Sequence, residues 1–107
     1  MNSKVIEGLS VDVSGGEGGK LLSVKGRITV DSSPTLRDRL LAILRQESPP
    51  TLTIDLTAVP YIDCSGLATL VEALKIARAV KTKLRLRLHD RPRYLFEVTG
   101  LLPFFES

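Results

Sequence analysis

The residue types best suited to chemistry in this sequence stand together in one segment, Asp63-Cys64-Ser65-Gly66. An apolar run with helical spacing follows, so Ser65 is expected just before a helix, where backbone N–H groups are free and the helix dipole is positive. The Ser65 hydroxyl could cap such a helix, which contributes about 1 kcal/mol. It could also accept a phosphate, whose charge of about −1.5 to −2 suits a helix N-terminus and alters any surface around it. The residues alone leave both roles open.

Nucleophilic catalysis is the other chemistry that this segment could support. Cys64 is a candidate nucleophile because a helix N-terminus favours the thiolate, and Ser65 could form a dyad with His89, the single histidine. A triad also needs a third group to orient the imidazole, and the sequence offers no identifiable one. One cysteine and one histidine are too few for the usual four-ligand Cys/His zinc site. We therefore expect a binding protein without enzymatic activity, metal or cofactor.

Asp63 and Tyr61, which precede Ser65, could each have one of two roles. Asp63 either stabilises the segment by accepting hydrogen bonds from backbone N–H groups, or engages a cation or a metal held by a partner. Tyr61 is either an apolar plug or a contact residue for a partner.

Hydrophobic periodicity predicts the elements that position this segment. Alternating apolar and polar residues indicate four strands, over 9–14, 21–25, 51–56 and 83–88. A glycine-rich loop joins the first two strands as a hairpin. Helical spacing, caps and prolines predict three helices, over 34–48, 67–77 and 90–98.

The connections between these elements carry their own signals. Asp31-Ser32-Ser33 offers cap side chains for the first helix. The stretch 57–66 is expected to be a link between strand and helix. Gly100 suits the end of the third helix, and the apolar tail 101–107 is expected to pack against the domain.

This order of elements predicts an α/β fold. Helical crossovers between the later strands imply parallel pairing, whereas the hairpin is antiparallel, so the sheet of four to five strands is mixed. Strands buried on both faces read as continuous apolar runs, but these strands alternate. We expect a two-layer sandwich with the helices mainly on one face of the sheet.

Length and charge narrow the class of protein. The chain has 107 residues, 43% of them hydrophobic, which fits a single domain over residues 1–107. No apolar run approaches the roughly 20 residues of a membrane span, and the start lacks a signal-peptide pattern, so a cytoplasmic protein is expected. Residues 75–93 hold eight basic side chains and one acidic, +8 − 1 = +7, which leaves +3 − 7 = −4 elsewhere.

The basic region includes Lys83, Arg85 and Arg87, which should share one face of a strand. These cations either form a solvated sheet face or contact acidic lipid or nucleic acid. No aromatic residue interleaves them, which disfavours base stacking. We expect no direct binding of nucleic acid.

The segment 54–67, a strand followed by a link, Asp-x-Ser-Gly and an apolar helix, resembles the central signature of STAS domains. Anti-sigma factor antagonists and the cytoplasmic tails of sulfate transporters share this fold. The resemblance extends over residues 9–105 and includes Gly26-Arg27-Ile28 and Thr99-Gly100-Leu101. The sequence departs from the family pattern at Cys64, where Ser or Thr is commoner, and at Thr29, where many members have Asp.

The resemblance implies a regulatory function. In anti-sigma factor antagonists the serine before the glycine, here Ser65, is phosphorylated by the anti-sigma factor, a serine kinase with a histidine-kinase-like ATPase fold. The unphosphorylated form binds that kinase and the phosphorylated form is released. The resemblance places the partner contacts at Thr29, Tyr61, Asp63, Cys64, Ser65 and Gly66. We expect a monomer or a weak dimer that regulates sigma-factor-dependent transcription.

A second function is compatible with the same resemblance. The chain could be a STAS subunit of an ABC-type lipid transport complex, docking on an ATPase or permease without phosphorylation. The basic strand would suit a position near anionic lipid.

Overall fold

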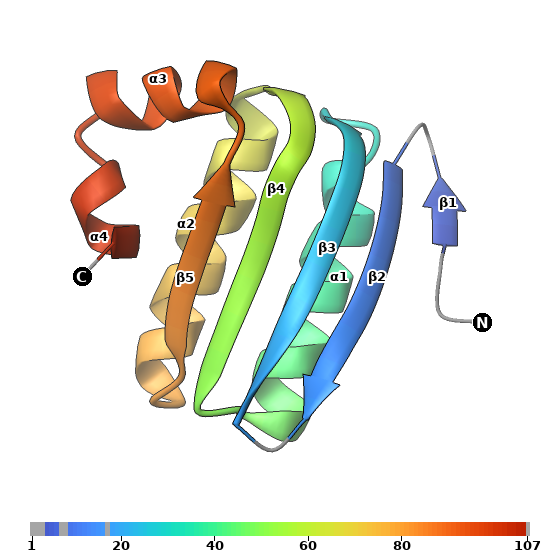
Figure 1. Cartoon of the computed structure of the whole chain (residues 1–107), viewed down its shortest axis with the longest axis vertical. Helices are drawn as coiled ribbons and strands as arrows, with labels where there is room; N and C mark the ends of the chain where they lie inside the picture. Colours follow the sequence, from blue (N-terminus) through green and yellow to red (C-terminus); the bar gives the residue numbers. More distant parts are fainter. Residues whose placement is uncertain (1–3, 7–8, 17, 107) are drawn as a thin grey trace.

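The protein is a mixed sheet with helices, seen in a computed structural model that describes residues 4–6, 9–16 and 18–106 (Figure 1). Its elements in chain order are β1 (Lys4–Ile6), β2 (Leu9–Gly16), β3 (Gly19–Ile28), α1 (Ser33–Ala42), the π-helical turn η1 (Ile43–Glu47), β4 (Thr51–Ile62), α2 (Cys64–Ala79), β5 (Lys83–Leu88), α3 (Asp90–Val98) and α4 (Leu102–Glu106). The five strands lie in the order β1-β2-β3-β4-β5. Strands β1, β2 and β3 pair antiparallel, whereas β3, β4 and β5 pair parallel. The expected mixed sheet and hairpin are confirmed.

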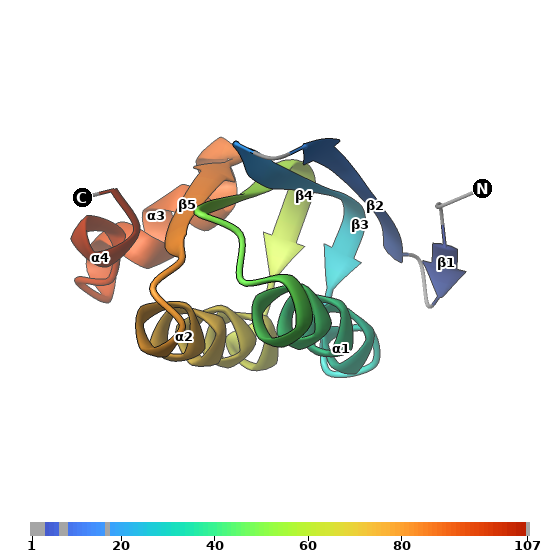
Figure 2. The same cartoon turned by 90° about the horizontal axis from the view of Figure 1, so that it is seen from below.

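The helices form a second layer on one side of the sheet. Helices α1 and α2 lie side by side beneath it, and the opposite face is uncovered (Figure 2). Helices α3 and α4 pack at the β5 side, with α3 against β4 and α4 against β5. The expectation of a two-layer α/β sandwich with helices mainly on one face is confirmed.

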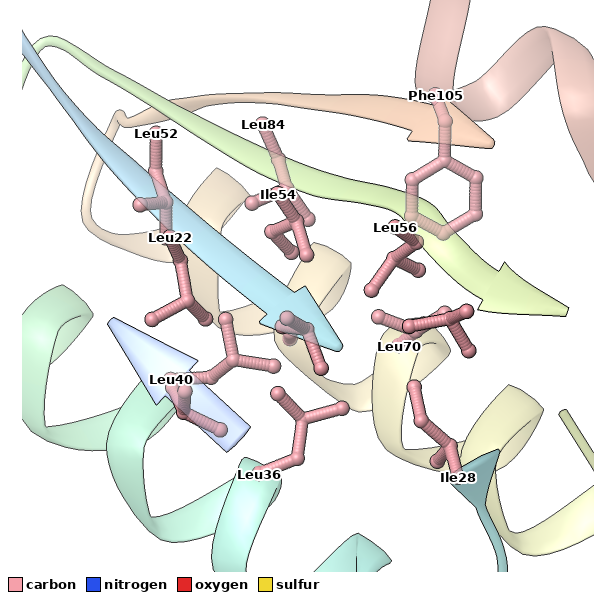
Figure 3. Packing of buried hydrophobic residues seen from close by; sticks show 14 of the residues in the cluster. Leu22, Ile28, Leu36, Leu40, Leu52, Ile54, Leu56, Leu70, Leu84 and Phe105 are labelled. Carbon is pink, nitrogen blue, oxygen red and sulfur yellow. The ribbon is translucent and has the colours of Figure 1, made fainter. Parts of the chain in front are cut away.

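The core lies between the sheet and the two lower helices. Side chains from both layers meet there, among them Leu22, Ile54, Leu36, Leu40 and Leu70 (Figure 3). On β5, Leu84 is buried, whereas the cations over 83–87 are exposed. The alternation therefore assigns the faces of this strand correctly.

The face that α2 turns to the sheet differs from the expected one. The helical spacing of Leu67, Leu70, Val71 and Leu74 predicts that all four side chains face the sheet, but only Leu70 is fully buried. Its buried companions are small: Gly66, Thr69, Ala73 and Ala77. A Cβ on Gly66 would lie 2.5 Å from Ile28 Cγ2. Small residues are needed because the helix backbone approaches the strands closely at this point.

Three boundaries also differ from expectation. Strand β4 continues to Ile62, so most of the expected link is strand. This part of β4 pairs with β3, and two register shifts interrupt the pairing. Helix α2 begins at Cys64, three residues early. Helix α1 begins at Ser33 without a side-chain cap, because the Ser32 hydroxyl bonds within its own loop.

The end of the chain packs down as expected. Helix α3 ends before Gly100, which has a positive φ of 74°. Phe105 of α4 is buried, with its ring edge-on to that of Phe96 at a centroid distance of 5.6 Å. The short β1 and α4 were not expected as separate elements.

An ion pair ties the two lower helices together. Arg37 of α1 donates from Nε and Nη2 to the two carboxylate oxygens of Glu72 of α2, at 2.7 and 2.8 Å. Such a bidentate pair has a defined geometry. It links the two helices at the surface of this layer.

Candidate functional site

Two loops meet at the edge of the sheet where β3 and β4 end. The strands are parallel neighbours, so both of their carboxyl ends point the same way (Figure 1). The chain leaves β3 through residues 29–32 into α1, and leaves β4 through Asp63 into α2. The Asp63 N–H donates to the Ile28 carbonyl at 3.0 Å, which joins the two loops.

The Asp63 carboxylate organises this junction. Oδ1 accepts from the N–H groups of Ser65 and Gly66, at 2.9 and 3.1 Å. Oδ2 accepts from the Val30 N–H at 3.0 Å, across to the other loop. Asp63 is thus the N-cap of α2, and the alternative in which Ser65 caps this helix is wrong, because Ser65 already lies in its first turn.

The pKa of Asp63 reflects these bonds. The hydrogen bond from the Ser65 hydroxyl is the largest effect holding the pKa of this carboxyl below its ordinary value, and the three backbone N–H groups act in the same direction. Asp63 is therefore ionised at neutral pH.

The Ser65 hydroxyl lies between two side chains. It donates to Asp63 Oδ1 at 2.5 Å, and its oxygen accepts from the Ser33 hydroxyl at 3.3 Å. Ser65 is half-buried, so it remains accessible, whereas Ser33 is buried. A hydroxyl whose proton is directed at a carboxylate is arranged for nucleophilic attack. The positive end of the α2 dipole favours an anion beside it.

Ser33 is the residue of this site that sequence reasoning missed. It was considered only as a possible cap for its own helix. The signal that could have found it is topological, since helices that follow parallel neighbouring strands both start at the same edge of the sheet.

Three other residues were expected at the site, Cys64, Gly66 and Thr29, and the structure gives each a different environment. Cys64 is exposed beside Ser65 and is a free thiol. Gly66 is buried under the start of α2. Thr29 holds its own loop: its N–H donates to the Ser32 hydroxyl and its hydroxyl accepts from the Asp31 N–H.

Tyr61 does not join this group. Its side chain points away from buried Ile62, toward the uncovered face of the sheet, and is 45% exposed. The guanidinium of Arg27 lies over its ring, 4.8 Å from the centroid. Tyr61 is therefore not an apolar plug for the segment around Ser65.

The dyad alternative has no support in the geometry. His89 caps α3, where its Nδ1 accepts from the Arg91 N–H at 3.2 Å. No bond between His89 and Ser65 is found among the described residues. That part of the chain also contains no cluster of three metal-ligating side chains. None of its helices is long and apolar enough to span a bilayer.

An apolar hollow of about 440 Å³ adjoins the site along α2. Its apolar lining includes Cys64, Leu67, Val71 and Leu101, and the charged residues Glu72 and Lys75 also line it. Ser65 thus lies beside an accessible apolar surface.

Comparison with known proteins agrees with this arrangement. A model of the STAS domain family matches residues 10–107. The anti-sigma-B factor antagonist of Bacillus subtilis is 34% identical over 94 residues, which cover 87% of this chain and 84% of that protein. The corresponding protein of Listeria monocytogenes is 37% identical over 84 residues, covering 78% and 73%.

A solved structure gives the same result. The crystal structure of an anti-sigma factor antagonist from Mycobacterium paratuberculosis superimposes with a TM-score of 0.78 at 27% identity, covering 92% of this chain and 83% of that chain. The family match spans nearly the whole chain and includes the Asp63–Gly66 segment that begins α2. The protein therefore belongs to the STAS domain family.

Proposed function

We propose that this protein is an anti-sigma factor antagonist that is switched by phosphorylation of Ser65. The observation that carries the proposal is the Ser65 hydroxyl, held between the Asp63 carboxylate and the Ser33 hydroxyl at an accessible helix start. The similarity to anti-sigma-B factor antagonists supports the same role. The partner is a kinase-type anti-sigma factor with a histidine-kinase-like ATPase fold.

The partner supplies ATP and Mg²⁺, and this chain supplies the nucleophile. Ser65 Oγ attacks the γ-phosphorus, the bond from that phosphorus to the β,γ-bridging oxygen breaks, and ADP leaves. Asp63 orients the hydroxyl and accepts its proton as the new P–O bond forms. The protein has no catalytic activity of its own.

The phosphate changes binding more than folding. Its charge of about −1.5 to −2 stands at the N-terminus of a 16-residue helix, where the helix dipole favours an anion. The same charge faces Asp63 and adjoins the apolar hollow. A partner surface that covers the neutral hydroxyl would have to desolvate this dianion, so the complex dissociates.

The regulatory consequence follows from these two states. Unphosphorylated protein occupies the anti-sigma factor and leaves the sigma factor free, and phosphorylation reverses this. We place the protein in the cytoplasm, as a monomer or weak dimer that does not contact DNA.

The test begins by identifying the partner. Wild-type, Ser65→Ala and Ser65→Asp proteins are used as baits in lysate of the source organism with Mg-ADP, and the captured proteins are identified by mass spectrometry. We expect wild-type and Ser65→Ala to retain an ATPase of the histidine-kinase type, and Ser65→Asp to lose it. Ser14→Asp adds the same charge at the hairpin end of the sheet, far from the site, and should bind like wild type.

The second step uses purified components. Incubation with the captured kinase and Mg-ATP should place one phosphate at Ser65, located by peptide mass. Phosphate only at another residue, or equal binding of the Ala and Asp forms, contradicts the switch. Capture of a transporter ATPase instead would favour the lipid-transport function.

A further inference from the structure

A second hollow lies beside the ends of β3 and β4 and the start of α3. Figure 1 shows that these three chain segments lie at the same end of the sheet. Its volume is about 430 Å³. Arg27 and Tyr61 line it from the strands, and Arg91 lines it from the first turn of α3. It is distinct from the Ser65 site, because Tyr61 and Ser65 belong to opposite sides of the sheet.

The hollow concentrates positive charge. Arg27 and Arg91 both line it, and no carboxylate does. The ion pairs found in the described part of the chain are Lys20–Glu47, Arg37–Glu72 and Arg93–Glu97. Neither lining guanidinium is therefore neutralised by an acidic partner there. Two such groups offer forked donors that match the oxygens of a phosphate.

The remaining lining is apolar and includes one aromatic ring. The Tyr61 ring is 45% exposed, and the other lining residues are Pro60, Ile62, Pro92 and Leu95. The Arg27 guanidinium already rests over the Tyr61 ring, which orients it before any ligand arrives. A ligand with an anionic group and an aromatic ring would match both the positive charge and the apolar lining of the hollow.

We propose that this hollow binds a small aryl phosphate. Its volume lies within the range of small-molecule sites, about 300–1,000 Å³. A phosphate dianion matches two guanidinium groups in charge. The proposal goes beyond the Ser65 switch and does not depend on it.

Binding would join two elements, β3 and α3, that lie beside the end of β4. Tyr61 stands two residues before Asp63 in the chain, and Arg91 belongs to α3. A phosphate held by Arg27 and Arg91 would link the end of β3 to the start of α3, next to Tyr61 of β4. Occupancy would therefore be felt at the loop that leads into Ser65.

The experiment uses the purified chain with phenyl phosphate as the probe, followed by amide chemical shifts in two-dimensional NMR. We expect saturable shifts centred on residues around Tyr61 and Arg91. Arg27→Gln and Arg91→Gln should each raise the dissociation constant by about tenfold to a hundredfold, the effect of losing charge-assisted hydrogen bonds. Both side chains are exposed, so the variants should fold, which their spectra would verify.

The matched control is Arg85→Gln, which removes an exposed charge from the uncovered sheet face without lining this hollow. It should change the dissociation constant by less than about twofold. Equal weakening by Arg85→Gln and Arg27→Gln would overturn the site, because it would mean attraction to the basic face as a whole.

Two further probes test the phosphate group and the aromatic ring of the ligand separately. Inorganic phosphate should bind more weakly than phenyl phosphate, and phenol should produce no saturable shift. Equal binding of the two phosphates would overturn the aryl part of the proposal. Ser65→Ala should bind phenyl phosphate like wild type, so failure of this site and failure of the Ser65 switch can be told apart.

Discussion

Helices α1 and α2 lie side by side on the same face of the sheet but are held there differently. Helix α1 buries large side chains, including Leu36, Leu40 and Leu41, and its start lacks a side-chain cap. Helix α2 buries mainly small residues, and Asp63 bonds its first N–H groups. Large apolar side chains hold α1 on the sheet. The start of α2 is held by close packing of small residues and by hydrogen bonds to Asp63. The accessible Ser65 hydroxyl is on α2, the helix whose start is held by these specific contacts.

The largest effect should come from the one large buried side chain of α2. Leu70→Ala should lower the free energy of unfolding by about 2–5 kcal/mol, because it leaves a cavity among core residues. Val71→Ala is the control, since Val71 is half-buried and lines the surface hollow, and should cost less than about 1.5 kcal/mol. Chemical denaturation measures both. Equal decreases in the free energy of unfolding would show that Leu70 and Val71 do not lie on a buried and a surface face of α2.

The next effect tests the close fit at the helix start. Gly66→Ala should cost about 1–3 kcal/mol, because the new methyl group would press on Ile28 and Ile62 side chains at 2.5 and 2.7 Å. Gly18→Ala is the control, with no atom within 4 Å of its Cβ position. A stable Gly66→Ala protein with an unchanged denaturation midpoint would show that α2 can move away from the strands.

The cap itself should have a smaller effect, and one that depends on pH. Asp63→Ala should cost about 0.5–2 kcal/mol near neutral pH. Because the pKa of Asp63 is lowered in the folded protein, its charge stabilises the fold above the unfolded pKa of about 3.9. That stabilisation is lost as pH falls from there through the folded value.

The comparison variant for this titration is Asp63→Asn, which cannot ionise. The difference in unfolding free energy between wild type and Asp63→Asn should be greatest above pH 5 and shrink below about pH 4. A difference that stays constant across this range would mean that the charge of Asp63 does not contribute.

The smallest effect concerns the contact between the two helices at the site. The Ser33–Ser65 hydrogen bond is long, at 3.3 Å, so a double-mutant cycle with alanine at both positions should give a coupling of about 0.5–1 kcal/mol. Ser33→Ala and Ser65→Ala are measured alone and together by denaturation. Additive losses would show that the two hydroxyls do not interact in solution.

Local patterns predicted most of the architecture but not the contacts of the site. Alternation identified which face of β5 is buried, and helical spacing located α1, α2 and α3, because both signals repeat over many residues. The extension of β4 to Ile62 was missed because register shifts interrupt the alternation. Asp63 and Ser65 are both good caps by residue type, so only the backbone geometry could decide between them. Ser33 was missed because its partner lies 32 residues away.

That separation along the chain affects when the proposed switch could operate. Val30 and Ser33 contribute to a site whose other half begins at Asp63, and β4 must pair with β3 before the halves meet. A short linear peptide containing Ser65 has the same local sequence but lacks the donors from the first loop. During synthesis, likewise, the site is absent until the chain beyond residue 66 has left the ribosome. If the kinase reads this arrangement, it responds to finished molecules and ignores nascent or unfolded ones.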